Sequence, residues 1–279
     1  MASVVIPAHN EARVIARCLR SVLDQSMPSD EIVVVCNGCS DDTAEVARGV
    51  DERVRVEEIS EASKIAALNR GDELVSSFPR LYVDADVELG PGVLPALVEA
   101  LDEPPLELAS PGVRFDLTDS SWVVRAYYRI WSQLPSVRDD TVGRGVYALS
   151  AAGRSRFDAF PDVMGDDHFV RDHIDPSRRG IVGEVWSTVR APRSLAGVMR
   201  RRIRVATALR QLDTATPVSR RRARGRQREW LGVVRRDPRL VPIAPLYVMV
   251  AVWPRVVVLA RRLRHARPRW DRDETSRTE

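Results

Sequence analysis

Two carboxylates, Asp84 and Asp86, stand one residue apart at the end of an apolar stretch. Residues 81–84 are β-prone and predict a short buried strand. Because side chains alternate along a strand, both carboxylates point to the same side if the extended geometry continues through Ala85. Converging anionic groups repel each other unless a cation or a donor-rich ligand lies between them. Such oxygen ligands favour Mg²⁺ or Mn²⁺, which would hold phosphate oxygens in turn; a polar turn without a ligand is the alternative.

A second acidic pair, Asp166 and Asp167, follows Gly165. Gly165 permits a sharp turn, and two aspartates can begin a helix, where the positive end of the helix dipole stabilises them. A capped helix start is therefore a sufficient explanation of the pattern alone. His168 and His173 lie beside this pair, but their five-residue separation is not the spacing of a helical metal pair, so no zinc site is predicted.

Lys64 is the only lysine among 43 basic residues. Arginine fills the other positions, so the retained ammonium group indicates a specific role, against the alternative of a solvated surface charge. Asn69 lies five residues further on in the same predicted helix, residues 62–75, and its side chain falls on a nearby but not identical face.

Alternating strands and helices are expected to position these groups. Buried strands are predicted at residues 3–7, 31–36 and 53–59, and helices lie between them. Asn10 is expected to cap the first helix. The apolar side chains within residues 14–23 of that helix lie on one face. This alternation predicts a doubly wound, mainly parallel α/β sheet whose ligands bind beyond the carboxyl ends of the strands. Because no glycine-rich phosphate loop is present, phosphate binding is expected to go through a metal.

Four motifs in this order resemble those of the family 2 glycosyltransferases. They are VVIPAHNE at 4–11, NGCSDDT at 37–43, SKIAALNRG at 63–71 and DAD at 84–86, and the resemblance covers about residues 1–190. It implies a GT-A fold with a Rossmann-like sheet. It also implies an inverting, metal-dependent enzyme that moves a sugar from a nucleoside-diphosphate sugar to an acceptor hydroxyl.

The resemblance also implies roles for the matching residues. The nucleotide-sugar contacts that it implies are Pro7, Asn10 and Glu11 at the nucleoside, Asp41 or Asp42 at the base, Lys64 and Asn69 near the diphosphate and ribose, and Asp84 and Asp86 at the metal. From the residues alone, Asn10 and Asp41 can equally be helix caps, and Glu11 can simply favour a helix N-terminus.

A catalytic base is implied at the second acidic pair. In the resembled family a Glu-Asp pair stands there with a downstream leucine and arginine. Here the pair is Asp166 and Asp167, and Val170 replaces the leucine. Asp167 is expected to be the base and Asp166 its support.

The middle of the chain predicts further helices at residues 94–101 and 120–134. It also predicts a strand at 107–115 that is interrupted at 111–112, and another strand at 142–150. The aromatic residues of the second helix are at helical spacing, which favours core packing over a platform for sugars. They are Trp122, Tyr127, Tyr128 and Trp131.

The C-terminal part has a different charge. Residues 1–194 carry 21 basic and 32 acidic side chains, whereas residues 195–279 carry 22 basic and 7 acidic ones. We expect a catalytic domain at 1–194, a basic and apolar helical extension at 195–266 and a disordered tail at 267–279. By resemblance, the basic cluster 200–204, and Arg202 within it, would close over the diphosphate; a solvated helix face is the alternative. A Gln-x-x-Arg-Trp pattern is missing, which disfavours processive polymer synthesis.

The most apolar stretch, residues 240–260, is interrupted by Pro242, Pro245, Pro254 and Arg255. It predicts either a helix at an anionic membrane surface or a buried C-terminal helix, and a clean membrane span is not expected. No secretory signal is visible, and Cys18, Cys36 and Cys39 do not make a disulfide framework. The expected location is cytoplasmic, with peripheral contact to the inner face of the plasma membrane.

The sequence thus predicts an inverting glycosyltransferase with Mg²⁺ or Mn²⁺, and its acceptor would be a glycan, lipid-linked or small molecule. One alternative is nucleotidyl transfer on a related fold, although the loop after the first strand lacks the glycines that this reaction would need. Another is a nucleic-acid-binding protein that uses the arginine-rich tail, which the acidic first part disfavours. A third is a catalytically silent scaffold on the same fold. The spacing of Cys36 and Cys39 also matches redox and metal-binding motifs, but such short motifs often match by chance.

Overall fold

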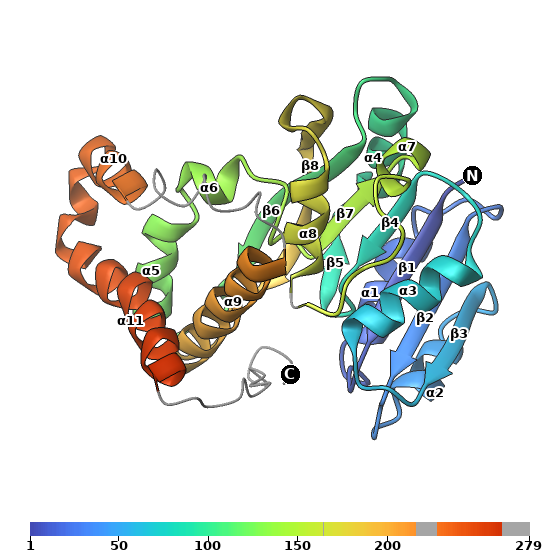
Figure 1. Cartoon of the computed structure of the whole chain (residues 1–279), viewed down its shortest axis with the longest axis horizontal. Coiled ribbons are helices and arrows are strands. Elements are labelled where there is room, and N and C mark those ends of the chain that lie inside the picture. The colour runs from blue at the N-terminus through green and yellow to red at the C-terminus, as the bar shows by residue number, and fades with distance from the viewer. Residues whose placement is uncertain (164, 216–227, 264–279) are drawn as a thin grey trace.

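A twisted sheet of eight strands organises the chain. The computed structural model describes residues 1–163, 165–215 and 228–263. Within them the strand order is β3-β2-β1-β4-β7-β6-β8-β5 (Figure 1). The strands are β1 (Ser3–Ala8), β2 (Glu31–Asn37), β3 (Val54–Ile59), β4 (Arg80–Val83), β5 (Val87–Leu89), β6 (Leu108–Asp116), β7 (Val146–Leu149) and β8 (Arg179–Arg190).

The N-terminal half of the sheet is parallel, as the alternating pattern predicts. Strand β1 pairs with both β2 and β4, and β2 pairs with β3, all in parallel. Strand β7 then joins β4 and β6 in antiparallel fashion, and β6 pairs in parallel with β8. Because parallel strands end at the same edge, the loops after β1, β2 and β4 gather there.

Eleven α-helices accompany the sheet in the described residues. They are α1 (Ile15–Leu23), α2 (Thr43–Arg48), α3 (Lys64–Leu74), α4 (Val93–Asp102), α5 (Trp122–Trp131), α6 (Pro135–Arg138), α7 (Ala151–Arg154), α8 (Asp166–His173), α9 (Leu195–Ala215), α10 (Glu229–Arg236) and α11 (Ala244–Leu263). Residues 216–227 and 264–266 of the predicted helical extension, and the predicted tail 267–279, lie outside the described residues.

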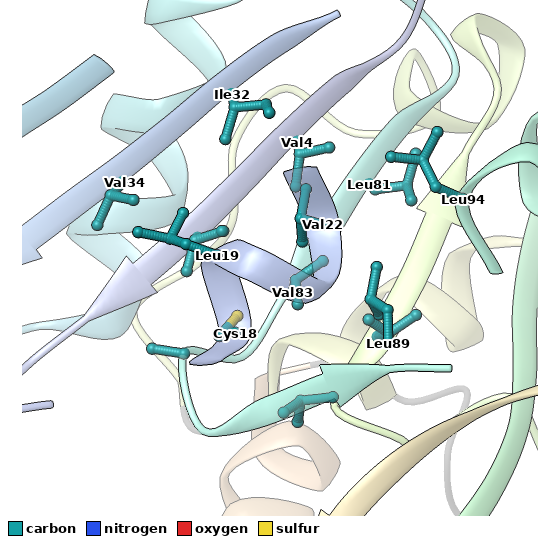
Figure 2. Close-up of a cluster of buried hydrophobic side chains, with 14 of the residues drawn as sticks. Val4, Cys18, Leu19, Val22, Ile32, Val34, Leu81, Val83, Leu89 and Leu94 are labelled. Atoms are coloured by element: carbon teal, nitrogen blue, oxygen red, sulfur yellow. The ribbon is translucent and has the colours of Figure 1, made fainter. Parts of the chain in front are cut away.

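The two faces of the sheet are buried in two apolar clusters. Val4 belongs to the cluster under α1, and its neighbour Val5 belongs to the cluster under α3. Figure 2 shows Leu19 and Val22 of α1 packed against the strands. On the other face, a Cβ at Gly71 would lie 2.3 Å from Val5 Cγ1, so this glycine lets α3 approach β1 closely.

Asn10 does not cap α1, so that prediction is wrong. The helix begins at Ile15, and the carbonyl of Glu11 accepts hydrogen bonds from the backbone N–H groups of Val14 and Ile15. Asn10 instead has a positive φ of 54° and accepts a 2.8 Å hydrogen bond from the backbone N–H of Ser40. It therefore joins the loop after β1 to the loop after β2.

Two strand predictions need smaller corrections. Strand β1 does not break at Pro7 but continues to Ala8. The predicted interruption at residues 111–112 is a register shift inside β6, which runs unbroken from Leu108 to Asp116. Such a bulge bends a strand without ending it.

A helical layer formed by α5, α9, α10 and α11 lies at one end of the sheet, on the left of Figure 1. Tyr127 and Tyr128 of α5 are buried in its core, as predicted from their helical spacing, whereas Trp122 is 77% exposed. In the part of the chain that the structure describes, no helix has the length and apolarity to cross a bilayer.

Candidate active site

A cavity of about 950 Å³ opens at the carboxyl edge of the sheet. It is bounded by the loop after β1, the start of α3, the end of β4, the entry to β7, the start of α8 and part of α9. Asp84 and Asp86 line it together with Asp166 and Asp167. The two acidic pairs, about eighty residues apart in sequence, therefore share one site.

Lys64 connects the two acidic pairs. Its Nζ lies 2.7 Å from Asp84 Oδ1 and 2.9 Å from Asp166 Oδ1. Lys64 is the first residue of α3, where Ser63 caps the helix by accepting a hydrogen bond from the backbone N–H of Ala66. The cap fixes the helix start, and with it the position of the ammonium group between the carboxylates.

Asp84 and Asp86 lie in a turn rather than in a continued strand. Strand β4 ends at Val83, and the N–H of Val87 donates a 3.0 Å hydrogen bond to the carbonyl of Asp84. The condition for the predicted same-side arrangement, an extended backbone through Ala85, is therefore not met. Both side chains nevertheless reach the cavity.

The segment that enters β7 touches both acidic pairs. The N–H of Asp84 donates a 2.8 Å hydrogen bond to the carbonyl of Gly145, and the N–H of Gly143 donates a 2.8 Å hydrogen bond to Asp167 Oδ2. Gly145 has φ +67°, and a Cβ there would lie 2.3 Å from a methyl carbon of Val87. A side chain at position 145 is thus excluded both by conformation and by space.

Asp166 and Asp167 begin α8 directly after Gly165, which has φ 94°. Asp166 is buried, and its Oδ2 accepts a 3.1 Å hydrogen bond from the Tyr147 hydroxyl while its Oδ1 faces Lys64. Asp167 is less buried and accepts hydrogen bonds from the backbone N–H groups of Gly143 and His168. The two neighbours thus have different surroundings: Asp166 is held in an ion pair, and Asp167 faces the cavity.

The pKa values of this cluster are shifted by burial and by charge. Burial raises the pKa of Asp84, Lys64 opposes this, and the charges of Asp86 and Asp166 add to the increase. Burial alone would lower the pKa of Lys64, but the two carboxylates beside it outweigh burial and raise it. At neutral pH Lys64 is therefore charged and holds the cluster together.

The pKa of Asp167 is shifted in the opposite direction. Burial would raise it, but the His168 ring, the Gly143 N–H and the charge of Lys64 together lower it below its ordinary value. Asp167 is therefore ionised at neutral pH and able to accept a proton.

The side chains around Asp84 and Asp86 can be compared with the ligands that a divalent cation needs. The described residues hold no group of three or more His, Cys, Asp or Glu side chains arranged to bind a metal by themselves. Mg²⁺ in nucleotide sites is usually held by one or two carboxylates plus substrate phosphates. Two half-buried aspartates on a cavity wall fit that kind of site, in which the nucleotide completes the coordination.

The other residues expected at the nucleotide sugar fall into two groups. Pro7, Glu11 and Arg202 line the cavity, whereas Asn10, Asp41 and Asn69 do not. The side chains of Asn10, Asp41 and Asn69 make hydrogen bonds to other parts of the protein. Asp41 accepts hydrogen bonds from the N–H groups of Ala12 and Thr43, and the Asn69 amide bonds both backbone groups of Phe160. These side chains join the loops that frame the cavity.

Sequence reasoning missed Gly143 and Tyr147 as parts of the site. Both lie in the segment 142–150, which was expected to be a strand where the backbone could approach a ligand. The side chain of Tyr147 points to Asp166 because β7 pairs with β4 in a register that sets Tyr147 beside Tyr82. The sequence signal for these two residues is a tyrosine in a predicted strand that begins with two closely spaced glycines.

Comparison with known proteins identifies a family. The family model described as glycosyl transferase family 2 matches residues 3–159. An uncharacterized glycosyltransferase, YibD of Escherichia coli (strain K12), is 27% identical over 144 residues, which are 50% of this chain and 40% of YibD. The match thus spans less than half of the length of this curated relative.

Solved structures share the fold. The mannosyltransferase PcManGT from Pyrobaculum calidifontis, solved with GDP-Man and Mn²⁺, has a TM-score of 0.64 at 20% identity, over 95% of this chain and 79% of that one. Glucosyl-3-phosphoglycerate synthase from Mycobacterium tuberculosis, solved with Mn²⁺, UDP-glucose and phosphoglyceric acid, has a TM-score of 0.56 at 21% identity, over 76% and 80% of the two chains.

Proposed function

The chain belongs to glycosyl transferase family 2 and has the GT-A fold, and on that premise we propose that it is an inverting, metal-dependent glycosyltransferase. It would transfer a sugar from a nucleoside-diphosphate sugar to an acceptor hydroxyl. One observation carries the proposal: Lys64 bridges Asp84 and Asp166 in a cavity that Asp86 and Asp167 also line. A cation-binding edge and a proton acceptor then face the same space.

The donor would lie with its nucleoside along Pro7 and Glu11 and its diphosphate toward Lys64. Asp84 and Asp86 would hold Mg²⁺ or Mn²⁺, which, when bound, offsets the negative charge on the leaving diphosphate. PcManGT and glucosyl-3-phosphoglycerate synthase were solved with Mn²⁺ and a nucleotide sugar, which supports this assignment. Arg202 would add positive charge from α9.

Asp167 would be the base. Its carboxylate takes the proton of the acceptor hydroxyl while the acceptor oxygen attacks the anomeric carbon from the face opposite the diphosphate. The new bond joins this oxygen to the anomeric carbon, and the bond from that carbon to the diphosphate oxygen breaks with its electron pair leaving on the nucleotide. The configuration therefore inverts.

Asp166 is less suited to be the base. Both of its oxygens are engaged, one by Lys64 and one by the Tyr147 hydroxyl, and the side chain is buried. Its charge instead keeps Lys64 in place. Within the described residues, the hydrogen bonds that Asp167 accepts come from the backbone N–H groups of Gly143 and His168, and the side chain faces the cavity, which supports the choice of Asp167.

A thermal-shift screen tests the proposal. The melting temperature is measured with UDP, GDP or TDP, each with Mn²⁺, with Mg²⁺ or without metal. We expect one nucleotide to raise it by several degrees only when a metal is present, because ligands that bind the folded state stabilise it. Asp86→Ala should lose this increase. If no nucleoside diphosphate stabilises the protein with either metal, the proposal fails.

We further propose that the enzyme works on the inner, cytoplasmic side of the plasma membrane, as a peripheral protein with an acceptor of the cell envelope. Four apolar side chains on one helix, α11, support membrane contact because each is about half exposed. They are Met249, Val252, Trp253 and Val256. Apolar side chains on an exposed helix face can enter the boundary between head groups and acyl chains.

A further inference from the structure

The cavity extends beyond the acidic residues into the helical layer. Its further wall is formed by α5, α9 and α11, with Trp230 of α10. The aromatic side chains there include Tyr127, Tyr128, Trp131 and Tyr247. We call this part of the cavity the helical arm, and define it by the lining residues of α5, α9, α10 and α11.

The helical arm is apolar, unlike the sheet edge. Apart from the tyrosine hydroxyls and three arginines, its lining consists of aromatic and aliphatic groups such as Val198, Val205 and Ala251. Small-molecule sites of this size, up to about 1,000 Å³, use apolar walls to bury ligand surface and a few polar groups to orient it. A sugar nucleotide is strongly polar and would leave the arm unfilled.

Two buried polar atoms in the helical arm, the Tyr127 hydroxyl oxygen and Arg202 Nε, have no hydrogen-bond partner within the described residues. The Tyr127 hydroxyl is buried, and it makes no hydrogen bond within the described residues. Burial raises the pKa of Tyr127, so it stays a neutral O–H donor, and the charge of Arg202 acts against this increase. A buried donor without an acceptor is unfavourable, and an anionic ligand oxygen would satisfy it.

Positive charge lies on the same wall. Arg201, Arg202 and Arg204 of α9 all line the cavity. A phosphate group held there would meet the arginines and the Tyr127 hydroxyl together. The arm then offers one place for an anion and a longer wall for an apolar chain.

The arm also reaches the surface. Val252 lines the cavity and is 46% exposed, and Trp253 and Val256 beside it are about half exposed. An apolar chain longer than the arm would leave it over the exposed apolar side of α11. The ligand need not fit entirely inside the protein.

We propose that the helical arm is the subsite for a lipid-linked acceptor, in which a hydroxyl-bearing head is joined through phosphate to an apolar chain. The head hydroxyl lies at Asp167, the phosphate at Tyr127 with Arg201 and Arg204, and the chain between α5, α9 and α11, while Arg202 is left to the donor diphosphate. This inference rests on the proposed function, since it supplies the acceptor for that transfer. An acceptor without an apolar chain would not use the arm.

Calorimetric titration with decyl phosphate, below the concentration at which it forms micelles, tests the proposal. Ala251→Phe places a larger side chain into the arm, and Met249→Phe is the matched control, because Met249 lies on the same helix but does not line the cavity. We expect decyl phosphate to bind the wild type and the control equally, and Ala251→Phe about tenfold more weakly or worse.

Tyr127→Phe is a second variant that keeps the shape of the arm. It removes only the unpartnered hydroxyl, so the folded state should keep its melting temperature, while decyl phosphate should bind about tenfold more weakly. Equal binding by wild type, Ala251→Phe and Tyr127→Phe would overturn the proposal. So would inorganic phosphate binding as tightly as decyl phosphate, because the chain would then contribute nothing.

Nucleotide binding separates this inference from the proposed function. The same variants are titrated with the nucleoside diphosphate selected by the thermal-shift screen, in the presence of Mn²⁺, and should all bind it as the wild type does. If the nucleotide binds but decyl phosphate does not, only the acceptor subsite is refuted. If no nucleotide binds to the wild type, the proposed glycosyl transfer fails whatever the arm binds.

Discussion

Lys64 places one ammonium group between two carboxylates that come from distant parts of the sequence. Asp84 follows the fourth strand, and Asp166 begins α8. The charge of Asp166 alone would raise the pKa of Asp84, and Lys64 opposes that increase. Lys64 therefore offsets part of the negative charge of the two acidic pairs that line this cavity.

Lys64→Met should make the protein respond more strongly to a cation. Without the ammonium, the three carboxylates at positions 84, 86 and 166 repel each other, and the melting temperature should fall. Added Mn²⁺, with no nucleotide, should then raise the melting temperature more in the variant than in the wild type, because it replaces the lost positive charge. Lys64→Arg is the control and should behave like the wild type. Equal responses of Lys64→Met and wild type to Mn²⁺ would argue against this role.

Asp167→Asn should abolish transfer while donor binding remains. Loss of a general base typically costs 10²–10⁴-fold in rate. Progress curves of sugar transfer and a separate nucleotide titration distinguish the two effects. Asp172→Asn, at a buried aspartate on the same helix that pairs with Arg171, is the comparison for a general effect on α8. Weak nucleotide binding with normal turnover in Asp167→Asn would reject the assignment.

At the scale of elements, Arg171 links helix α8 to the segment before β7, in addition to the hydrogen bond from Gly143 to Asp167. Arg171 Nη1 lies 3.0 Å from Asp140 Oδ2, and its Nη2 lies 2.9 Å from Asp172 Oδ1. All three side chains are at most 10% exposed. The position of Asp167, which is four residues before Arg171 in the same helix, therefore depends on this largely buried ion-pair network.

Arg171→Met should destabilise the fold strongly. Removal of Arg171 takes its positive charge away from two largely buried carboxylates, Asp140 and Asp172, and breaking a buried pair typically costs about 3–5 kcal/mol. Urea denaturation measures the loss. Arg138→Met is the matched control, since Arg138 pairs with Asp139 on the surface, where ion pairs contribute little. Equal midpoints for the two variants would show that the buried network is not needed for stability.

Glu31 at the start of β2 gives the stability a defined pH dependence. Burial would raise its pKa, but the Ser3 hydroxyl and the N–H groups of Ser77 and Ser76 lower it from 4.5 to about 2. Because the folded-state pKa is the lower one, the carboxylate stabilises the fold fully above the unfolded-state value. This contribution is lost as the pH falls through about 2.

Glu31→Gln should therefore be less stable than the wild type at about pH 6. The difference in stability between the two proteins should be smaller at about pH 2.5. Urea midpoints at both pH values give the comparison. Glu52→Gln, at an exposed carboxylate, should show no such narrowing. A gap that stays constant with pH would exclude the hydrogen-bonded carboxylate as the cause.

Local patterns in the sequence were sufficient for the parallel half of the sheet. Apolar runs, caps and turns each depend on residues close together, and the predicted strands and helices up to β4 are present. The contact of Tyr147 with Asp166 could not be predicted, because it depends on the antiparallel register of β7 with β4. The hydrogen bond from Val87 to Asp84 likewise depends on the residue at which β5 begins, and the pattern of residues 81–86 does not indicate that residue.

The proposed site residues show the same limit. Asp84, Asp86, Asp166 and Asp167 were expected to converge, and all four line one cavity. Asn69 lies on the predicted helix, but its amide bonds Phe160, about ninety residues away in sequence, so its surroundings were not visible from local spacing. Convergence follows from topology, whereas individual contacts follow from distant packing.

For the whole molecule, the apolar side of α11 and the arginines of α9 belong to one helical layer. Figure 1 shows this layer at the opposite end of the molecule from β3. Apolar and cationic groups on one end favour an anionic membrane surface. In the proposed membrane contact, the acidic first part would face away from the lipid.

Trp253→Ser should weaken binding to vesicles that contain phosphatidylglycerol. Trp253 is 54% exposed on α11, whereas Trp122, the control, is 77% exposed at the start of α5. Cosedimentation at low and high salt measures the bound fraction, which should fall with salt for the wild type. Trp122→Ser should bind as the wild type does. If both tryptophan variants bind equally, α11 is not the contact.

The short segment from Gly143 to Gly145 has a consequence for how this enzyme can be altered. One end of it bonds Asp167 and the other bonds Asp84, so two peptide units of backbone set the separation between the proposed proton acceptor and the proposed metal ligand. The helices that would choose the acceptor lie outside this segment. Chimeras that exchange α9 to α11 for those of another relative should therefore change which molecule receives the sugar without altering the stereochemical course of the reaction.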